Sequence, residues 1–281
     1  MKKIMITGAN SYIGTSFERY IKEYFPNDYS IDITDVTEKS WREKSFIGYD
    51  SILHVAGIAH QKETKDNVKL YYEINRDLAV EIAKKAKMDG VKQFVFISSM
   101  SVYGMNAGVI TKETIPEPKS NYGKSKLQAE KEIKKLENTE FKVCILRPPM
   151  VYGKGCKGNF NKIKEMVKKL PFFPYIKNER SMIYVDNLSS FIKMCIDKNV
   201  WGLYFPQNRF YISTMDIAKN IALAMNKKIY FDYLTGLAVW LLRLFSPLIK
   251  KAFGSLIYKD ISDFDFSYII VENEQSLIQS V

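Results

Sequence analysis

Short apolar runs alternate with segments of helical periodicity through the first half of the chain. The runs have the length and composition of buried parallel strands, and they lie at Lys3–Thr7, Tyr29–Ile33, Ser51–Val55, Gln93–Ser98 and Lys142–Arg147. Apolar residues at helical spacing predict three long helices, over Ser11–Tyr24, Val68–Met88 and Asn121–Leu136. Because strands and helices alternate, we expect an α/β fold built on a doubly wound parallel sheet.

The pattern loosens after Pro148-Pro149, where a glycine-rich loop and shorter elements follow. We therefore expect a main domain over residues 1–150, whose core continues through parts of 181–206. Residues 151–281 are expected to form mainly a small C-terminal α/β lobe, laid over the carboxyl ends of the strands.

The segment Leu234–Ile257 is unusually rich in apolar residues. Its uninterrupted apolar runs are far shorter than the roughly 20 residues that a membrane span needs, and Arg243 and Pro247 interrupt it. We expect a buried helix pair in the small lobe. The alternative is an interfacial helix that makes a peripheral membrane contact, with Lys250 and Lys251 reaching the headgroups.

The chain carries 42 Lys and Arg against 31 Asp and Glu, a formal net charge of +11. Such an excess indicates anionic partners. Lysine pairs such as Lys84-Lys85 and Lys134-Lys135 fit the solvated faces of separate helices, and no basic tract with interleaved aromatic residues occurs. A phosphorylated substrate or a membrane surface is therefore favoured, and nucleic acid is not expected.

Three widely spaced cysteines and two histidines limit the metal and redox chemistry open to the chain. The cysteines form no Cys-x-x-Cys pair, so neither a disulfide framework nor a metal site is predicted. The apolar run at the amino end is too short for a signal peptide. We expect a cytoplasmic protein, associated with a membrane only if residues 234–257 face one.

The connection between the first strand and the first helix has the features of a dinucleotide phosphate loop. Such a loop needs a tight turn, bare backbone and a helix amino terminus that points at the anion. Ser11 stands where a glycine usually lets backbone and phosphate approach, and its hydroxyl could bond a phosphate oxygen instead. The cofactor-binding candidates in this loop are Gly8, Asn10, Ser11, Tyr12, Ile13 and Gly14.

An acidic residue after the second strand would bind the adenosine ribose hydroxyls. Asp32 and Asp35 are both candidates, because Asp32 falls inside the strand pattern and Asp35 falls near its end. A carboxylate at this place disfavours the additional phosphate of NADP. NAD is therefore preferred over NADP.

Tyr122 and Lys126 are four residues apart at the start of a predicted helix and share one helix face. A tyrosine normally keeps its proton up to about pH 10, and a nearby lysine charge favours the phenolate. Ser99, which follows the fourth strand, could hold the substrate oxygen that Tyr122 deprotonates. Together with a nucleotide site, these residues indicate hydride chemistry at an alcohol carbon.

Several further motifs follow the phosphate loop, in order, up to about Leu203. They are His54-Val55-Ala56-Gly57, Asn75, Ser98-Ser99-x-x-Val102-Tyr103-Gly104, Tyr122-x-x-x-Lys126, Leu146-Arg147-Pro148-Pro149-Met150-Val151-Tyr152-Gly153 and Arg180-Ser181-Met182-Ile183-Tyr184-Val185-Asp186. In this ordered set the chain resembles the extended short-chain dehydrogenase/reductases, specifically the NAD-dependent nucleotide-sugar epimerase/dehydratase branch. The resemblance implies a Rossmann domain that binds NAD over residues 1–150 and a mainly substrate-binding lobe over 151–281.

The resemblance also implies roles for the site residues. Tyr122 is the general base or acid on a sugar hydroxyl and Ser99 binds the same sugar oxygen. Lys126 lowers the pKa of the tyrosine and holds the nicotinamide ribose. Arg180 binds the substrate's diphosphate, for which a planar guanidinium is well suited.

Residues near the third strand complete the candidate site. By the same resemblance, Ala56 and Gly57 line the cofactor. Asn75 either lies near the nicotinamide end or simply bonds backbone. His60 follows the third strand, at the edge where ligands collect in such sheets, and is either a sugar contact or an exposed loop residue.

The activity that follows from the resemblance is an NAD-dependent epimerase of a UDP-linked hexose or N-acetylhexosamine, acting at C4. Surface polysaccharide precursor synthesis and a homodimer are the family's usual setting and assembly. The closest alternative is an NAD(P)H-dependent reductase of a 4-keto nucleotide sugar, which uses the same residues. A non-catalytic NAD-binding protein at the membrane surface would have a broken catalytic set, whereas Ser99, Tyr122 and Lys126 are all present.

Overall fold

The computed structural model describes residues 1–59, 61, 63–261 and 265–281, and it divides into two compact units. The first unit comprises Met1–Gly104, Pro116–Pro148 and Leu188–Pro206. The second comprises Met105–Ile115, Pro149–Asn187 and Gln207–Val281. Residues 105–115, which the sequence placed in the main domain, belong to the second unit because β5 (Gly108–Ile110) pairs with β12 (Leu256–Tyr258).

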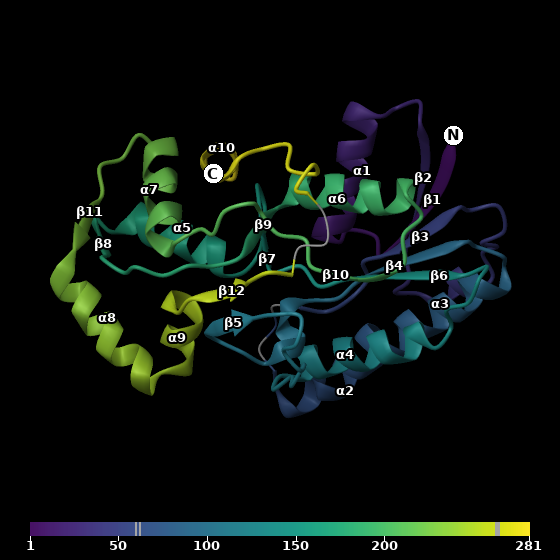
Figure 1. Ribbon diagram of the computed structural model, residues 1–281, viewed down its shortest axis with the longest axis horizontal. Coiled ribbons are helices and arrows are strands. Elements are labelled where there is room, and N and C mark those ends of the chain that lie inside the picture. Colours follow the sequence, from purple (N-terminus) through teal and green to yellow (C-terminus); the bar gives the residue numbers. More distant parts are fainter. Residues whose placement is uncertain (60, 62, 262–264) are drawn as a thin grey trace. The chain divides into compact units, whose positions relative to one another are not determined.

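The first unit is built on a six-stranded parallel sheet, which confirms the predicted fold class (Figure 1). The strand order is β10-β6-β4-β3-β1-β2. Their bounds are β1 Lys2–Thr7, β2 Tyr29–Thr34, β3 Ser51–His54, β4 Gln93–Ile97, β6 Lys142–Leu146 and β10 Gly202–Tyr204. Thr7 pairs with both Thr34 and His54, so the carboxyl ends of the central strands meet at one edge of the sheet.

Helices cover both faces of this sheet. Figure 1 shows α1 and α6 on one face and α3 and α4 on the other. The helix expected over residues 68–88 has a π-helical segment, η3, in its middle, and three short 3₁₀ segments join other elements within the described part of the chain. The bounds are α1 Tyr12–Tyr24, η1 Lys39–Arg42, η2 Lys65–Asn67, α2 Val68–Tyr72, η3 Glu73–Leu78, α3 Ala79–Met88, η4 Met100–Tyr103, α4 Asn121–Lys134 and α6 Val185–Asp197.

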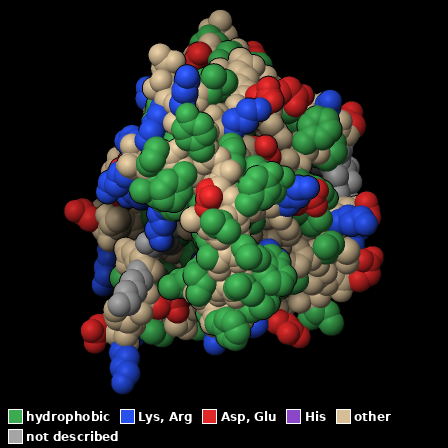
Figure 2. All heavy atoms as spheres, turned by 90° about the vertical axis from the view of Figure 1, so that its left-hand side faces the viewer, with side chains coloured by type: hydrophobic (Ala, Val, Ile, Leu, Met, Phe, Trp, Pro, Cys, Tyr) green, Lys and Arg blue, Asp and Glu red, His purple; other side chains and the backbone are tan. Residues whose placement is uncertain are grey.

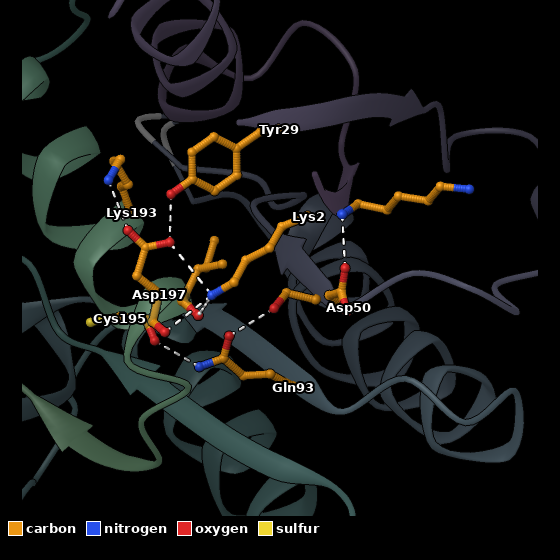
Figure 3. A network of polar contacts seen from close by, with 10 residues as sticks. Lys2, Tyr29, Asp50, Gln93, Lys193, Cys195 and Asp197 are labelled. Atoms are coloured by element: carbon orange, nitrogen blue, oxygen red, sulfur yellow. Dashed lines mark hydrogen bonds and ion pairs between the residues drawn. The ribbon is translucent and has the colours of Figure 1, made fainter. Parts of the chain in front are cut away.

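A polar network joins the end of α6 to the amino ends of the strands, the edge opposite the phosphate loop (Figure 3). Lys2 Nζ donates to the backbone carbonyls of Ile196 and Asp197, at 3.0 and 3.1 Å. The Asp197 carboxylate accepts hydrogen bonds from the Tyr29 hydroxyl and from Lys193 Nζ. Charged and polar groups at the protein surface are thus paired here, and they fix α6 against the sheet.

The second unit combines short strand pairs with five helices among the residues that the structure describes. Three parallel pairs occur, β7–β9, β8–β11 and β5–β12. The remaining strand bounds are β7 Met150–Tyr152, β8 Phe172–Pro174, β9 Met182–Tyr184 and β11 Tyr230–Asp232. The helices are α5 Asn159–Lys169, α7 Thr214–Ala224, α8 Tyr233–Phe245, α9 Pro247–Phe253 and α10 Asn273–Gln279.

The two helices predicted in Leu234–Ile257 exist as α8 and α9, but the expectation that they are buried is wrong. Gly236 is the one buried residue of α8, and α9 has none. The apolar pattern of this segment is compatible with a core or with an exposed surface, so burial could not be read from it. Over the described residues, no helix is both long enough and apolar enough to cross a membrane.

Candidate active site

The loop between β1 and α1 approaches the end of β3 very closely. Gly8 has a φ of +120°, and a Cβ at this position would lie 2.7 Å from the backbone nitrogen of Ala56. Asn10 also has a positive φ, of 62°, a conformation that asparagine adopts more readily than most residues. The sequence therefore provides the tight turn with bare backbone that the phosphate-loop prediction requires.

Ser11 is the N-cap of α1. Its Oγ accepts a hydrogen bond from the backbone N–H of Gly14 at 3.0 Å. A serine thus replaces the usual glycine without blocking the helix start, because its side chain turns toward the helix and satisfies one of the amides there. The amino end of α1 carries the partial positive charge that an anion at this loop needs.

The two acidic candidates for the adenosine ribose differ in their place on β2. Asp32 lies within the strand, pairs with Met5, and its Oδ2 accepts a hydrogen bond from the Tyr49 hydroxyl at 2.6 Å. Asp35 directly follows the strand, next to Thr34, whose carbonyl accepts from the Gly8 amide at 3.0 Å. The geometry therefore favours Asp35, because it lies beside the phosphate loop.

Asp35 is ionised and pre-oriented. The backbone N–H and the hydroxyl of Thr37 both donate to its Oδ1, at 2.8 and 2.7 Å. These two hydrogen bonds lower the pKa of the carboxyl group. A carboxylate held in this way can accept hydrogen bonds from the ribose hydroxyls.

Gly57, Asn75 and Lys126 come together beyond the end of β3. A Cβ on Gly57 would lie 2.9 Å from Asn75 Oδ1 and 3.2 Å from Lys126 Nζ. Asn75 is fully buried in the π-helical segment η3. Its Oδ1 accepts from the Ile58 amide at 2.8 Å, and its Nδ2 donates to the Ile58 carbonyl and to Ser125 Oγ, both at 3.2 Å. Asn75 therefore ties the loop after β3 to α4.

Ser99 and Tyr122 meet at the carboxyl edge of the sheet. Ser99 is the N-cap of η4, just after β4, and Tyr122 lies in the first turn of α4. Burial raises the pKa of the Tyr122 phenol, a hydrogen bond with Ser99 lowers it, and Tyr71 raises it again, with a net increase. In the protein alone Tyr122 is therefore a protonated phenol close to Ser99, whose Oγ donates to Ser101 Oγ at 3.2 Å and accepts from the Ser101 amide at 3.1 Å.

Lys126 lies one turn further along α4, inside the protein. Its Nζ donates to the Ile97 carbonyl at 2.9 Å and lies 4.8 Å from the centre of the Phe96 ring. Burial lowers the pKa of Lys126 to about 8, and the nearby Glu130 opposes this shift. The lysine's effect on the phenol stays a prediction.

A buried ionic cluster contacts Ser98, the residue before Ser99. This cluster was not predicted from the sequence. Arg147 donates to both carboxylate oxygens of Glu130, at 3.0 and 2.6 Å, and to the Tyr103 hydroxyl at 2.8 Å. Ser98 Oγ also donates to Glu130. One signal was available, because Glu130 follows Lys126 by four residues on the same face of α4. The cluster orients β4 and α4, which carry Ser99 and Tyr122.

His54 of the His54-Val55-Ala56-Gly57 motif belongs to the core and not to the site surface. Its ring stacks between Phe94 and Phe96, and its Nδ1 is 2.8 Å from the Thr7 hydroxyl. Burial, with a smaller effect from Lys126, lowers its pKa to about 3. The ring is therefore neutral and acts in packing.

The remaining substrate-binding candidates are Arg180 and His60. Arg180 lies in the second unit and is buried, with 8% of its surface exposed. Its Nη1 donates to the backbone carbonyls of Lys251 and Gly254, at 3.1 and 2.7 Å, which satisfies the carboxyl end of α9. His60 lies outside the residues that the structure describes.

The doubly wound sheet and its phosphate loop define a dinucleotide-binding enzyme of the α/β class. Residues 4–202 match the model of the NAD dependent epimerase/dehydratase family, and the chain belongs to that family. It is 29% identical over 278 residues to the UDP-glucose 4-epimerase of Vibrio cholerae. The aligned region covers 89% of this chain and 83% of the relative.

A second curated relative and a solved structure extend the comparison. The chain is 28% identical over 249 residues to the N-acetyl-alpha-D-glucosaminyl-diphospho-ditrans,octacis-undecaprenol 4-epimerase of Escherichia coli O157:H7, covering 80% of this chain and 73% of the relative. The UDP-glucuronic acid 4-epimerase of Bacillus cereus, in complex with NAD, has the same fold, with a TM-score of 0.76 and 18% identity. The superposed region covers 99% of this chain and 94% of the Bacillus cereus chain. Sugar reductases also occur among the similar proteins, so the chain is an NAD-dependent nucleotide-sugar epimerase or reductase.

Proposed function

We propose that the protein is an NAD-dependent epimerase that acts at C4 of a UDP-linked hexose or N-acetylhexosamine, in the synthesis of surface polysaccharide precursors. The observation that carries this proposal is the proximity of Ser99, which follows β4, and Tyr122, in the first turn of α4, with Lys126 one turn further along that helix. Both curated relatives described above are 4-epimerases by name.

The residues of the first unit fit a dinucleotide. The loop from Gly8 to Gly14 and the amino end of α1 suit the diphosphate, and Asp35 suits the adenosine ribose. Lys126 Nζ, beside Gly57, is proposed to hold the nicotinamide ribose. When NAD is bound, it supplies a hydride acceptor and a positive charge close to Tyr122.

The proposed chemistry moves one proton at the phenol oxygen of Tyr122. Tyr122 takes the proton of the sugar C4 hydroxyl while hydride leaves C4, and the Ser99 hydroxyl donates to the carbonyl oxygen that forms. The keto sugar turns over, hydride returns to its other face, and Tyr122 gives the proton back. The raised pKa of Tyr122 keeps the phenol protonated in the protein alone, whereas the first step needs the phenolate, with its proton already released to solvent. The positive charges of Lys126 and of the oxidised cofactor would favour that ionisation.

Two substrate contacts, by Arg180 and by His60, are proposals of the same kind. Arg180 would bind the diphosphate through guanidinium nitrogens other than Nη1, which already donates to two carbonyls. His60 would contact the sugar. The diphosphate could be carried by uridine or, as the name of the Escherichia coli relative indicates for that protein, by a polyprenol. A homodimer and a cytoplasmic location stay predictions.

One assay separates the epimerase from the reductase. The purified protein is incubated with UDP-glucose, UDP-N-acetylglucosamine, its undecaprenyl diphosphate counterpart or a 4-keto sugar nucleotide, each with and without NADH or NADPH. Sugar interconversion without added cofactor supports the epimerase. Stoichiometric NAD(P)H consumption with the keto sugar alone would instead establish the reductase.

A matched pair of variants tests the assignment of Tyr122. Tyr122→Phe is expected to lower the rate by on the order of 10² to 10⁴, the range for loss of a general acid–base group. Tyr72→Phe is the control, because Tyr72 is a partly buried tyrosine of the same region whose hydroxyl donates to Asn121 at 3.1 Å. Equal activity of the two variants would show that Tyr122 is not the acid–base residue.

A further inference from the structure

The helix α8 exposes its apolar face. Leu244, Phe245 and Leu248, which follows α8 at the start of α9, have 64, 84 and 79% of their surface exposed. Leu234, Leu237 and Trp240 are exposed as well. The opposite face contains the buried Gly236 and the partly buried Thr235 and Val239. A surface helix of a globular protein normally has the reverse arrangement.

The patch is continuous, and Figure 2 shows hydrophobic side chains gathered on the side of the molecule where α8 lies. Isolated exposed apolar residues are ordinary in proteins. A helix and the following turn that expose eight large apolar side chains, Leu241 and Leu242 among them, are not, and such patches mark interaction sites.

The charges beside this apolar surface indicate what kind of partner binds to it. From Tyr233 to Gly254 the sequence has three basic residues, Arg243, Lys250 and Lys251, and no acidic one. Both lysines are exposed on α9, next to the apolar surface. Trp240 is half exposed, with the Arg243 guanidinium 5.9 Å from its ring centre. Apolar side chains flanked by lysines and a tryptophan suit the interface of a bilayer with anionic headgroups.

The helix pair α8 and α9 is held by contacts with the rest of the second unit. Asp232 caps α8 by accepting from the Thr235 amide at 2.7 Å, and Tyr175 stacks on Tyr233 with ring centres 4.2 Å apart. Arg180 holds the carboxyl end of α9. The exposed apolar surface is therefore a fixed feature of the fold.

We propose that α8 and α9 dock the protein on the surface of an anionic lipid bilayer, with the apolar face of α8 inserted at the headgroup level and Lys250 and Lys251 on the phosphates. This docking is separate from the proposed epimerase activity, because the side chains that would contact the bilayer are not among the residues of the candidate active site.

Co-flotation of the full chain with vesicles tests the proposal. We expect binding to phosphatidylcholine vesicles that contain phosphatidylglycerol, and weaker binding to phosphatidylcholine alone. Leu244→Gln/Phe245→Gln is expected to weaken vesicle binding by on the order of tenfold or more. Lys250→Gln/Lys251→Gln is expected to lower it by about fivefold per lysine, most strongly at low salt.

A control variant distinguishes docking through α8 and α9 from nonspecific adsorption of exposed apolar side chains. Ile47→Gln/Met88→Gln removes two side chains of similar exposure, 74 and 82%, from the first unit and should bind vesicles like the wild type. The Trp fluorescence shift on vesicle addition should disappear in Trp240→Phe. Because the substituted side chains are exposed, circular dichroism should show unchanged folding.

Three results would overturn the proposal. They are absence of vesicle binding by the folded wild type, equal loss of binding in the Ile47/Met88 control, and self-association without vesicle binding that Leu244→Gln/Phe245→Gln abolishes. The last result would show that the face binds a second copy of the chain.

Discussion

Lys126 illustrates at the residue scale how function opposes stability. Its side chain has 4% of its surface exposed, and its ammonium donates to a single backbone carbonyl, that of Ile97. Burial lowers its pKa from 10.5 to about 8. A shift of this size corresponds to about 3 kcal/mol against folding at neutral pH, partly offset by about 1 kcal/mol from the hydrogen bond.

Lys126→Met is therefore expected to be inactive but more stable than the wild type near neutral pH, by about 1–2 kcal/mol. The unfolded chain binds more protons than the folded one between the lowered and the ordinary pKa of Lys126. Wild-type stability should therefore rise with pH from about 8 to 10.5, and the gap to the variant should close. Urea unfolding of both proteins across this range measures it. A variant less stable than the wild type at neutral pH would contradict the assignment of burial as the cause.

At the scale of elements, the active-site geometry depends on how closely α4 approaches η4. A Cβ on Gly123 would lie 2.5 Å from the backbone carbonyl oxygen of Ser101. A glycine beside Tyr122 thus allows the first turn of α4 to contact the segment that begins at Ser99. This requirement explains the glycine within Tyr122-Gly123-Lys124-Ser125-Lys126, where helix propensity alone would favour alanine.

Gly123→Ala is expected to push α4 away from η4, at a loss of on the order of 1–3 kcal/mol of stability. Activity should fall more than tenfold because Ser99 and Tyr122 separate. Lys124→Ala, on the exposed side of the same turn, is the control and should change neither property appreciably. Thermal unfolding and steady-state rates check both variants. An active, stable Gly123→Ala protein would show that the close approach is dispensable.

The carboxyl end of α6 provides a second test at this scale. Burial disfavours ionisation of Asp197, but hydrogen bonds from Lys193 and Tyr29 outweigh it, so the pKa of Asp197 is lowered. A lowered pKa means that the stabilisation is present above the ordinary carboxyl range and is lost as the pH falls through the lowered value. Asp197→Asn should therefore be less stable at neutral pH, and the difference should shrink in acid. Asp66→Asn, which changes an exposed carboxylate, should show no such trend in urea unfolding.

At the scale of the whole molecule, the sequence predicted the first unit well. The runs at 29–33 and 93–98 became β2 and β4 with ends shifted by one residue, because buried parallel strands have strong local signals. Ser99, Tyr122 and Lys126 could be placed because a strand end and a helix face locate them. The π-helical segment η3 within the predicted helix 68–88 could not, because an extra residue in a turn leaves the apolar pattern nearly unchanged.

The second unit was harder to predict because long-range contacts decide its form. The pairing of Val109 with Ile257 joins segments from opposite halves of the chain. The exposure of Leu244 and Phe245 depends on which face of α8 contacts the unit, and helical spacing does not specify that. Arg180 was singled out as an anion ligand, whereas its hydrogen bonds to Lys251 and Gly254 are visible only in the folded chain.

The central claim is that hydride leaves and returns to the same sugar carbon while Tyr122 carries the proton. The most direct test uses UDP-glucose deuterated at C4, incubated with the purified protein without added cofactor. We predict that the product epimer keeps its deuterium at C4, as measured by mass spectrometry and proton NMR. Loss of the deuterium to solvent, or product formation only with added NAD(P)H, would contradict the account.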